Sequence, residues 1–579
     1  MRENMQTFAT LYHHLGALPE NETFLNHLKS NRWKHSSKTE FLQTVRYLTL
    51  AFEAKGWRGK QIALAIDPSV YWLMIDYALI LSGAVSVPLF TNISTKNLRF
   101  EIADADIHTA FTQTEQQAQI IREANDKVVC IDIDSTCENC LSIESLSHEG
   151  KKIDKNEPEK FETLLSLIQP NDLVTIVYTS GTSGLPKGVE LSHQNLISQI
   201  IDTGIKYKFD ATRDIALSFL PLAHIFERMV IHFYVSTGMS IYFADDVKNV
   251  GNLLRSVHPT VMTVVPRLLE KVYFKMYTKA MQGNPLKKLL IMIAFKRANE
   301  KDPTQTKNIL DKLLEKLVYS KLRTSLGGNL RMMISGGAPL WDDLYRFFIN
   351  IGIPVYQGYG LTEASPVICA NAPGENKIGT CGKHFVHTQI KIADDGELLA
   401  KGPGIMIGYH NNQKMTDSTI DKQGWLHTGD LASADEEGYI SITGRKKDLS
   451  KTSTGEYISV NHIEQLLMAS GWFDHVIIVG NNRPFVVALL MLNEEVISKY
   501  GYHDNRKTNL SKKVHKEIKN YIESINKKLN HWEKIRDFHL VSEILTIEDG
   551  YLTPSMKLSK ESVEKRFKNE IEKMYEKHI

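Results

Sequence analysis

The sequence is poor in cysteine and carries little excess charge of either sign. It holds five cysteines in 579 residues, a sparse and odd count that is typical of a reducing compartment. Cys137 and Cys140 form a CxxC pair, but no second pair is spaced to complete a zinc site, so a metal or redox role is disfavoured. The net charge of +2 argues against nucleic acid as a partner and leaves room for weak contact with an anionic membrane surface.

The sequence also lacks a recognisable secretory leader and a clear membrane-spanning run. Its first residues, MRENMQTFATLYHH, contain no apolar core. The most apolar stretch, 71–90, includes Asp76 and Gly83 and reaches Pro88, which predicts a buried helix followed by a buried strand. We therefore expect a cytoplasmic protein and leave open peripheral contact with the inner membrane surface.

Apolar runs that alternate with helical patterns predict an α/β fold for the first three quarters of the chain. A chain of 579 residues exceeds what one hydrophobic core usually holds, so several domains are expected. From Gly379 onward, short strands and turn residues predict a β-rich subdomain. We predict a large N-terminal domain of layered α/β subdomains plus this β-rich subdomain (1–444), a hinge (445–451) and a small C-terminal α+β domain (452–579). The runs that indicate strands in the first part are 61–66, 84–90, 127–133 and 173–178.

Residues 276–325 form long charged helical patterns. The stretch contains KAMQGNPLKKLLIMIAFKRANEKD and ILDKLLEKLVYSKL. A surface helical insertion is a better interpretation than a direct role in chemistry, because charged positions alternate with apolar ones at helical spacing.

The densest cluster of glycine and hydroxyl residues, TSGTSGLPKG, directly follows the last of these predicted strands. Glycines allow a tight turn close to a ligand, and the hydroxyls and Lys187 suit polyphosphate oxygens. A Walker loop would need glycine where Pro186 stands and a hydroxyl where Gly188 stands. The pattern favours a different polyphosphate loop over an ordinary turn, followed by a strand and a helix that begins at Ser192 or Asn195.

Two later segments place carboxylates in turns. YQGYGLTEAS contains Glu363, and a carboxylate beside phosphates is tolerated with a cation such as Mg²⁺. The alternative is a buried glutamate that caps a helix. GWLHTGDLA contains Asp430, which can accept hydrogen bonds from both hydroxyls of a ribose, or can simply stabilise its turn.

Three further segments are ambiguous on their residues alone. LPLAHIFER combines His224 with an adjacent Glu–Arg pair, and the plain interpretation is a core histidine beside an intrahelical ion pair. ISGGAPL ends a strand with two glycines, where a flat ring or an acyl chain can lie close to the backbone. LTPSMKLSKESV contains Lys557 in a lysine-rich region, where a solvated side chain is the ordinary expectation.

Taken in order, these segments resemble the AMP-forming adenylate-forming superfamily, which includes acyl-CoA synthetases, adenylation domains of peptide synthetases and luciferases. YTSGTSGLPKGVELSH is similar to its signature loop, with Ser183 in place of the more usual threonine. LPLAHIFER, ISGGAPL and TPSMKLSK resemble the long-chain fatty acid–CoA ligase branch, and the motifs extend over roughly residues 45–560. The chain departs from the family pattern at Ser559 and Lys560, and TSTGEYISV lacks the usual second glycine and the proline.

The resemblance implies catalytic roles for four residues. Lys557 would reach into the site, Lys187 would neutralise phosphate charge, and Thr362 would meet the α-phosphate. Glu363 would hold Mg²⁺ together with Thr179.

The resemblance also implies binding roles and a mobile C-terminal domain. Asp448 would be the hinge pivot, and His224, Phe226 and Gly337 would lie along the acyl entrance. Tyr359 would stack on adenine, while Asp430 and Arg445 would contact the ribose. The full set expected around the nucleotide is Thr179, Ser180, Gly181, Thr182, Ser183, Gly184, Lys187, Gly336, Gly337, Ala338, Gln357, Gly358, Tyr359, Gly360, Thr362, Asp430, Ile442, Arg445 and Lys557.

The reaction that the resemblance implies is ATP-dependent activation of a fatty acid as an acyl adenylate, followed by acyl transfer to coenzyme A. One alternative is a fatty acyl-AMP ligase that loads an acyl carrier protein. Another is a catalytically silent acyl- or nucleotide-binding protein of the same fold, against which the intact set of charged motif residues argues. A Walker-type ATPase is opposed by Pro186 and Gly188.

Overall fold

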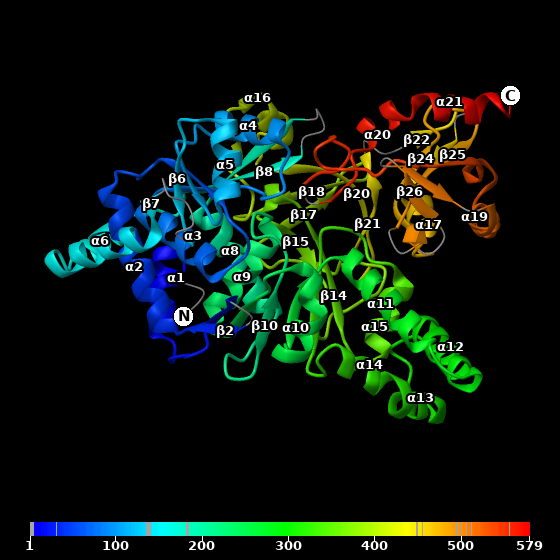
Figure 1. The fold of residues 1–579 in the computed structure, drawn as a ribbon, viewed down its shortest axis with the longest axis horizontal. Coiled ribbons are helices and arrows are strands. Elements are labelled where there is room, and N and C mark those ends of the chain that lie inside the picture. The colour runs from blue at the N-terminus through cyan, green and yellow to red at the C-terminus, as the bar shows by residue number, and fades with distance from the viewer. Residues whose placement is uncertain are drawn as a thin grey trace. The chain divides into compact units, whose positions relative to one another are not determined.

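The computed structural model describes most of the chain, which divides into two compact units (Figure 1). Unit 1 comprises Met1–Ala393, Leu398–Thr428 and Ala434–Ser441, and unit 2 comprises Asp394–Glu397, Gly429–Ser433 and Ile442–Ile579. The residues described are 5–29, 32–134, 141–180, 185–446, 450–453, 456–493, 496–498, 501–504, 507–510, 512–554 and 556–578. Cys137, Cys140 and Asp448 therefore lie outside the description, as do Gly181, Thr182, Ser183 and Gly184.

One sheet of unit 1 has eight strands in the order β19-β9-β8-β4-β3-β5-β6-β7. The four runs predicted as strands are confirmed, and neighbouring strands from β8 through β7 pair in parallel. The apolar stretch around Asp76 forms helix α3 (Val70–Ser82), which is buried along nearly its whole length and leads into β4, as predicted. The strands are β3 (Gln61–Ala65), β4 (Val85–Pro88), β5 (Thr109–Thr112), β6 (Val129–Asp132), β7 (Leu141–Ser142), β8 (Leu173–Ser180), β9 (Pro186–Ser192) and β19 (Gly408–Tyr409).

The second large sheet has nine strands in the order β16-β15-β14-β13-β12-β10-β11-β1-β2. Its central strands, from β14 to β1, pair in parallel, so the segments that follow them gather along one edge. Its strands are β1 (Leu25–Lys29), β2 (Arg32–Ser36), β10 (Ile215–Ser218), β11 (Ser240–Phe243), β12 (Val261–Val264), β13 (Met332–Ser335), β14 (Val355–Gly360), β15 (Val367–Ala370) and β16 (Lys383–His384).

Helices pack against these sheets, as expected for layered α/β architecture (Figure 1). Helix α8 begins after Ser192, whose hydroxyl accepts a hydrogen bond from the Asn195 backbone, so the first of the two predicted start positions is the cap. Besides α3, the α-helices that precede α11 are α1 (Phe8–Ala17), α2 (Lys38–Ala54), α4 (Thr95–Asp104), α5 (Glu115–Ala124), α6 (Ile143–Asn156), α7 (Lys160–Ser166), α8 (His193–Lys206), α9 (Ile225–Thr237) and α10 (Val250–Val257).

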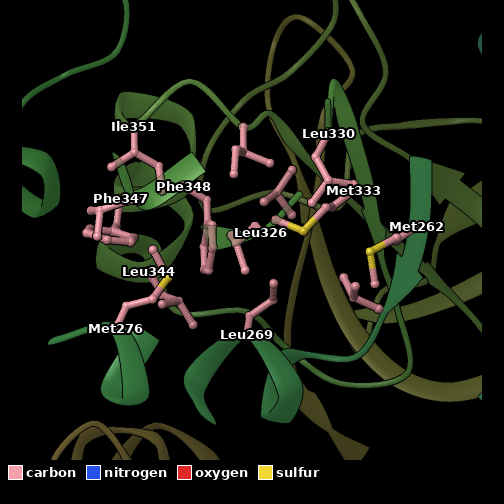
Figure 2. Close-up of a cluster of buried hydrophobic side chains, with 14 of the residues drawn as sticks. Met262, Leu269, Met276, Leu326, Leu330, Met333, Leu344, Phe347, Phe348 and Ile351 are labelled. Carbon is pink, nitrogen blue, oxygen red and sulfur yellow. The ribbon is translucent and has the colours of Figure 1, made fainter. Parts of the chain in front are cut away.

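The helices predicted across 276–325 are present. They are not purely a surface insertion, because one side of them is exposed and the other is buried in the core. Phe295 of α12 packs on Phe347 of α15, with ring centroids 4.9 Å apart, and both belong to one buried apolar cluster. Figure 2 shows the heart of this cluster, with Leu269, Met333 and Phe348 converging from separate elements. The elements are α11 (Pro266–Ala280), α12 (Pro285–Glu300), α13 (Ile309–Leu314), the π-helical turn η3 (Glu315–Tyr319), α14 (Ser320–Ser325) and α15 (Asp342–Asn350).

The β-rich region that was predicted after Gly379 forms a four-stranded sheet with the order β17-β18-β20-β21. Strands β17 and β18 pair antiparallel, with Ile390 opposite Ala400. The elements are β17 (Gln389–Ile392), β18 (Glu397–Lys401), α16 (Gln413–Thr419), β20 (Leu426–Ala434) and β21 (Ile440–Arg445).

Most of unit 2 is a small α+β fold around the three-stranded sheet β24-β25-β28. Every residue of β25 is buried because helices cover both faces: Ala488 packs in a cluster with α17 and α19, and Leu489 in another with α20 and α21. No helix in the described part of the chain is long and apolar enough to cross a membrane. The elements are β22 (Ser450–Lys451), β23 (Tyr457–Ile458), α17 (Val460–Met468), β24 (Phe473–Val479), β25 (Val486–Leu492), β26 (Gly501–Asp504), β27 (Lys507–Leu510), α19 (Lys512–Asn526), β28 (Ile535–Leu540), α20 (Lys560–Arg566) and α21 (Lys568–Glu576).

Candidate active site

A lysine, a glutamate and a tyrosine from three distant segments of unit 1 meet in one hydrogen-bonded cluster. Lys187 Nζ donates to Glu363 Oε1 at 2.6 Å and to the Tyr409 hydroxyl at 2.7 Å. The Tyr409 hydroxyl in turn donates to Glu363 Oε1 at 2.7 Å. The Lys187 ammonium also lies 4.4 Å from the centroid of the Tyr409 ring, which adds a cation–π contact.

Strand pairing brings these three residues together. Lys187 lies on β9, which pairs antiparallel with β8 on one side and with β19 on the other. Tyr409 belongs to β19 and is paired with Val189, two positions beyond Lys187 and therefore on the same face of β9. Glu363 lies in the 3-10 turn η4 (Thr362–Ala364), beyond the end of β14. A Cβ at Gly360 would lie 1.8 Å from the Pro366 carbonyl oxygen, so the chain can reach this turn only with glycine there.

The electrostatics of the cluster keep Glu363 ionised and Tyr409 protonated. Burial by itself would raise the pKa of Glu363, but the charge of Lys187 and the hydrogen bonds from Lys187 and Tyr409 outweigh it, so the pKa is lowered. Burial first, and then the negative charge of Glu363, raise the pKa of Tyr409 far above its ordinary value. The result is a buried carboxylate compensated by a cation, not a glutamate that caps a helix.

Thr179 faces the same side of the sheet as Lys187, because the two residues are directly opposite in the β8–β9 register. Its hydroxyl oxygen is buried and has no hydrogen-bond partner among the described residues. The next residue, Ser180, ends β8, and its side chain lies outside the description together with Gly181, Thr182, Ser183 and Gly184. The predicted contacts of that loop therefore stay predictions.

The oxygen donors at this site fit a small hard cation. Mg²⁺ is commonly held by one or two carboxylates and by substrate phosphate oxygens instead of a complete protein cage. Glu363 supplies one buried carboxylate, and Thr179 supplies a hydroxyl that no described residue hydrogen-bonds. Among the described residues, no group of three or more His, Cys, Asp or Glu side chains could hold a metal by itself.

The glycine-rich ends of β13 and β14 lie side by side, with Ser335 opposite Gln357 in the register. Gly337 has a φ of +82° and, with Ala338, leaves exposed backbone just beyond β13. Gln357 is buried, and Tyr359 is partly exposed. The chain then passes through Gly358, Gly360 and the buried Thr362 to Glu363. Most of the residues that are expected to surround the adenine base therefore lie along one edge of the sheet.

The side chain of Phe226 covers Gly336. A Cβ at Gly336 would lie 2.8 Å from the Phe226 ring, so glycine is what allows the ring to seat there. Phe226 is at the start of α9, and His224 caps that helix by accepting a hydrogen bond from the Phe226 backbone at 3.2 Å. His224, Phe226 and the ISGG turn are thus neighbours in space.

The intrahelical Glu–Arg pair expected within LPLAHIFER is wrong, and His224 is half-buried at the start of α9. Arg228 is fully buried and pairs with Asp76 of α3 at 2.6 Å. The adjacent Glu227 accepts a hydrogen bond from Ser218 at 2.6 Å instead. Adjacent residues of a helix point about 100° apart, so an i,i+1 pair cannot bridge.

Glu227 is the basis of a prediction about pH and stability, because burial raises its pKa to about 8, against the lowering effect of its hydrogen bonds. Between the ordinary value of 4.5 and about 8, the folded state keeps a proton that the unfolded state has released, so the free energy of unfolding falls as pH rises. Glu227→Gln is expected to remove this loss, which is worth roughly 2–5 kcal/mol. Urea unfolding at pH 5 and at pH 8 measures it.

The exposed position Glu22 offers a matched control for this experiment. Glu22→Gln should leave the pH dependence of unfolding unchanged. If Glu227→Gln shows the same loss of stability between pH 5 and pH 8 as the wild-type protein, Glu227 is ionised in the folded state and the expectation fails.

A second group of expected site residues lies within unit 2. Asp430 is buried on β20, and Arg445 of β21 contacts its Oδ1 through Nε at 3.0 Å. Ile442 is half-buried on the same strand as Arg445. Lys557 keeps exposed surface, yet desolvation and then the positive charge of Arg445 lower its pKa, while Asp430 opposes them.

Sequence reasoning missed Tyr409 and the residues that fix the loop before it. Asn195 of α8 donates to the backbone carbonyls of Pro403 and Ile405, both at 2.8 Å. The Met406 backbone N–H then donates to the Glu363 carbonyl at 2.9 Å. The segment before Tyr409, KGPGIMIGYH, contains Gly402, Gly404 and Gly408 and could have marked a tight loop, but nothing in it linked Tyr409 to Lys187 and Glu363.

Two protein-family models together match most of the chain. A model described as AMP-binding enzyme matches residues 14–410, and one described as AMP-binding enzyme C-terminal domain matches residues 447–579. Among similar named proteins is long-chain-fatty-acid–CoA ligase FadD15 of Mycobacterium bovis, 30% identical over 94% of this chain and 93% of its own length. Long-chain-fatty-acid–CoA ligase 5 of Mus musculus is 30% identical over 97% of this chain and 87% of its own length.

Solved structures share the fold at lower identity. The A domain of carboxylic acid reductase from Segniliparus rugosus, in complex with AMP and a co-purified carboxylic acid, matches with a TM-score of 0.75 and 19% identity, covering 100% of this chain and 96% of that one. O-succinylbenzoate coenzyme A synthetase from Bacillus subtilis, in complex with ATP and magnesium ion, matches with a TM-score of 0.66 and 19% identity, covering 95% and 98%.

Proposed function

We propose that this chain, which belongs to the AMP-binding enzyme family and is an AMP-forming acid–thiol ligase, activates a long-chain fatty acid and transfers it to coenzyme A. The observation that carries the choice of acid is the 30% identity, over nearly the whole chain, to proteins named long-chain-fatty-acid–CoA ligases. The apolar seat that Phe226 and Gly336 form supports an acyl group on that side of the site.

The first step joins the acid to the nucleotide. A carboxylate is a poor electrophile, so its oxygen attacks the α-phosphorus of ATP, an acyl–O–P bond forms and pyrophosphate leaves with the electron pair of the broken P–O bond. Negative charge crowds at phosphorus, and preorganised cations and donors are what lower that barrier. Lys187 and Thr362 supply a charge and a hydroxyl to the phosphates.

Glu363 and Thr179 would hold Mg²⁺ together with phosphate oxygens, and the ion would neutralise part of the phosphate charge. Lys187 and Tyr409 prepare Glu363 for this role, because their hydrogen bonds keep the buried carboxylate ionised. A cation can then share a carboxylate that is already charged, without a proton having to leave first.

The remaining residues bind the rest of the nucleotide and the acyl group. Tyr359 would stack on adenine beside Gly336, Gly337 and Ala338, and Asp430 with Arg445 would contact the ribose. In the second step the thiolate sulfur of coenzyme A attacks the acyl carbonyl, a thioester forms and AMP leaves. Lys557 would serve the first step, and the hinge around Asp448 would change its position between the two.

A chain-length series tests the proposal. Pyrophosphate release is measured with saturated acids from two to eighteen carbons, with and without coenzyme A. Each buried methylene contributes about 0.8 kcal/mol, so we expect kcat/KM for a sixteen-carbon acid to exceed that for acetate by roughly a hundredfold or more. Without coenzyme A, release should stop after about one turnover because the adenylate stays bound.

Three other outcomes of this experiment would contradict a part of the proposal. Equal rates for acetate and the long acid would contradict the substrate class. Thioester formed on an acyl carrier protein but not on free coenzyme A would replace the acceptor. Steady release of inorganic phosphate without any acid would contradict the ligase reaction itself.

A further inference from the structure

Helix α12 has two apolar faces, and only one of them is covered. Ile291, Phe295 and Ala298 lie at helical spacing and are buried in the core cluster that also contains Phe347. On the other side, Leu286 is 79% exposed and Leu289 is 55% exposed. A contiguous exposed apolar face on a helix marks a surface that another molecule or a membrane covers, so the open face of α12 indicates a missing partner.

The next helical segment adds a second exposed apolar stripe. Ile309 is 87% exposed, and Leu313 and Leu317 follow at intervals of four residues. Of the nineteen exposed large hydrophobic residues in the described part of the chain, eight fall within these two segments. These eight form what we call the α12–α13 patch: Leu286, Leu289, Met292, Ile293, Ile309, Leu310, Leu313 and Leu317.

Buried contacts hold the two segments together as one piece. Asp311 of α13 pairs with Arg297 at 3.0 Å and with Lys301 at 2.5 Å. The Tyr319 hydroxyl donates to the Ala294 carbonyl at 2.9 Å. Figure 1 shows α12 and α13 close together at the border of unit 1, in green. The patch is therefore displayed by a fixed helical platform.

The platform, taken together with α11 before it and α14 after it, is strongly basic. Residues 266–325 hold fourteen Lys and Arg against five Asp and Glu, a net +9, whereas the whole chain carries +2. Three of the five carboxylates, Glu270, Asp311 and Glu315, are already paired with basic side chains of the same region. The exposed lysines are Lys271, Lys275, Lys279, Lys287, Lys288, Lys296, Lys307, Lys312, Lys316 and Lys321.

From this combination we propose that the α12–α13 patch docks the protein on an anionic phospholipid surface. Apolar side chains would enter the acyl boundary while the lysines meet the headgroup phosphates, as in helices that lie in a membrane interface. Protein–protein interfaces are depleted in lysine, which makes a folded partner a poorer match. A second copy of the chain would bring a second net charge of +9 against the first.

Vesicle flotation without ATP or fatty acid tests the docking separately from the proposed reaction. The wild-type protein should float with vesicles of phosphatidylglycerol and phosphatidylcholine, and at least about tenfold less with phosphatidylcholine alone, since the anionic headgroups supply much of the attraction. Raising the salt to 1 M should weaken binding, because the Debye length falls to about 3 Å. No flotation with anionic vesicles would overturn the proposal.

Matched variants separate the patch from general hydrophobicity. The triple variant L286Q/L289Q/I309Q keeps good helix formers in α12 and should weaken vesicle binding at least about tenfold. The control L167Q/V247Q/V386Q changes three exposed apolar residues elsewhere in unit 1 and should bind as the wild type does. Equal binding by both triple variants would contradict the patch as the docking surface.

Charge and self-association are tested in the same way. K287Q/K288Q/K312Q should weaken binding to anionic vesicles, whereas K127Q/K151Q/K422Q, at exposed positions elsewhere, should not. Light scattering after size exclusion gives the oligomeric state. A dimer that L286Q/L289Q/I309Q converts to monomer, with no vesicle binding by either protein, would assign the patch to a second copy and overturn the membrane proposal. Thermal melting followed by circular dichroism checks that all four multiple variants are folded.

Discussion

Replacing Lys557 by alanine is expected to reduce acyl-adenylate formation at least about a hundredfold, the size of effect that loss of one preorganised charge stabiliser produces. The structure of unit 2 fixes the Lys557 backbone in a tight turn, since its N–H donates to the Thr553 hydroxyl at 3.0 Å and its carbonyl accepts from the Thr553 N–H at 2.8 Å. Acid-dependent exchange of pyrophosphate into ATP measures this step. Full exchange activity in the variant would remove Lys557 from the mechanism.

Two comparisons make the result specific. Lys565→Ala alters an exposed lysine of α20 in the same region and should leave exchange within about twofold of wild type, as surface substitutions usually do. When preformed acyl adenylate and coenzyme A are supplied, Lys557→Ala should still form thioester within about tenfold, because the lysine serves the first step. A loss of the same size in both half-reactions would indicate a general defect in binding.

The pKa of Lys557 adds a pH signature to this prediction. Desolvation and the Arg445 charge lower that pKa, so the ammonium form is lost at a lower pH than in an ordinary lysine. The adenylation rate of the wild type should therefore fall on the alkaline side of its profile. Lys557→Arg keeps its charge throughout and should lack that fall, even with a lower maximum.

Replacing Glu363 by glutamine should have the second large effect. The amide keeps the shape of the side chain but removes the charge that Lys187 compensates at 2.6 Å and that Mg²⁺ would share. We expect the Mg²⁺ concentration for half-maximal activity to rise at least about tenfold and kcat/KM for ATP to fall by roughly a hundredfold. A magnesium titration of pyrophosphate release measures both.

The chain offers two graded controls for Glu363. Glu190 lies on β9 with Lys187 and pairs with His410 at 2.7 Å, so Glu190→Gln removes a nearby, more exposed carboxylate and should leave the magnesium titration unchanged. Tyr409→Phe removes only the hydroxyl that bonds Lys187 and Glu363, and should reduce kcat/KM by about five- to twentyfold, as loss of a hydrogen bond to a charged group does. If Glu363→Gln leaves the magnesium titration unaltered, Glu363 is not a metal ligand.

Local pattern predicted much of the fold because strands and helices leave short-range signals. The alternation and length of the apolar runs predicted β3, β4, β6 and β8, and the interruption by Asp76 and Gly83 separated α3 from a membrane span. The same logic failed at Glu227 and Arg228, where adjacency suggested a pair. Charges pair by position in space, and Arg228 donates through Nε to Asp76, 152 residues earlier in the chain, at 3.0 Å.

By itself the sequence determined the elements, the family and the chemical character of Lys187, Glu363, Asp430 and Lys557, because residue types at short spacing are written in the chain. Tertiary structure alone decided that Tyr409 joins Lys187, that Phe226 covers Gly336, and which apolar face of α12 stays open. Those outcomes depend on strand register and helix rotation, which are set by packing between residues far apart in the chain.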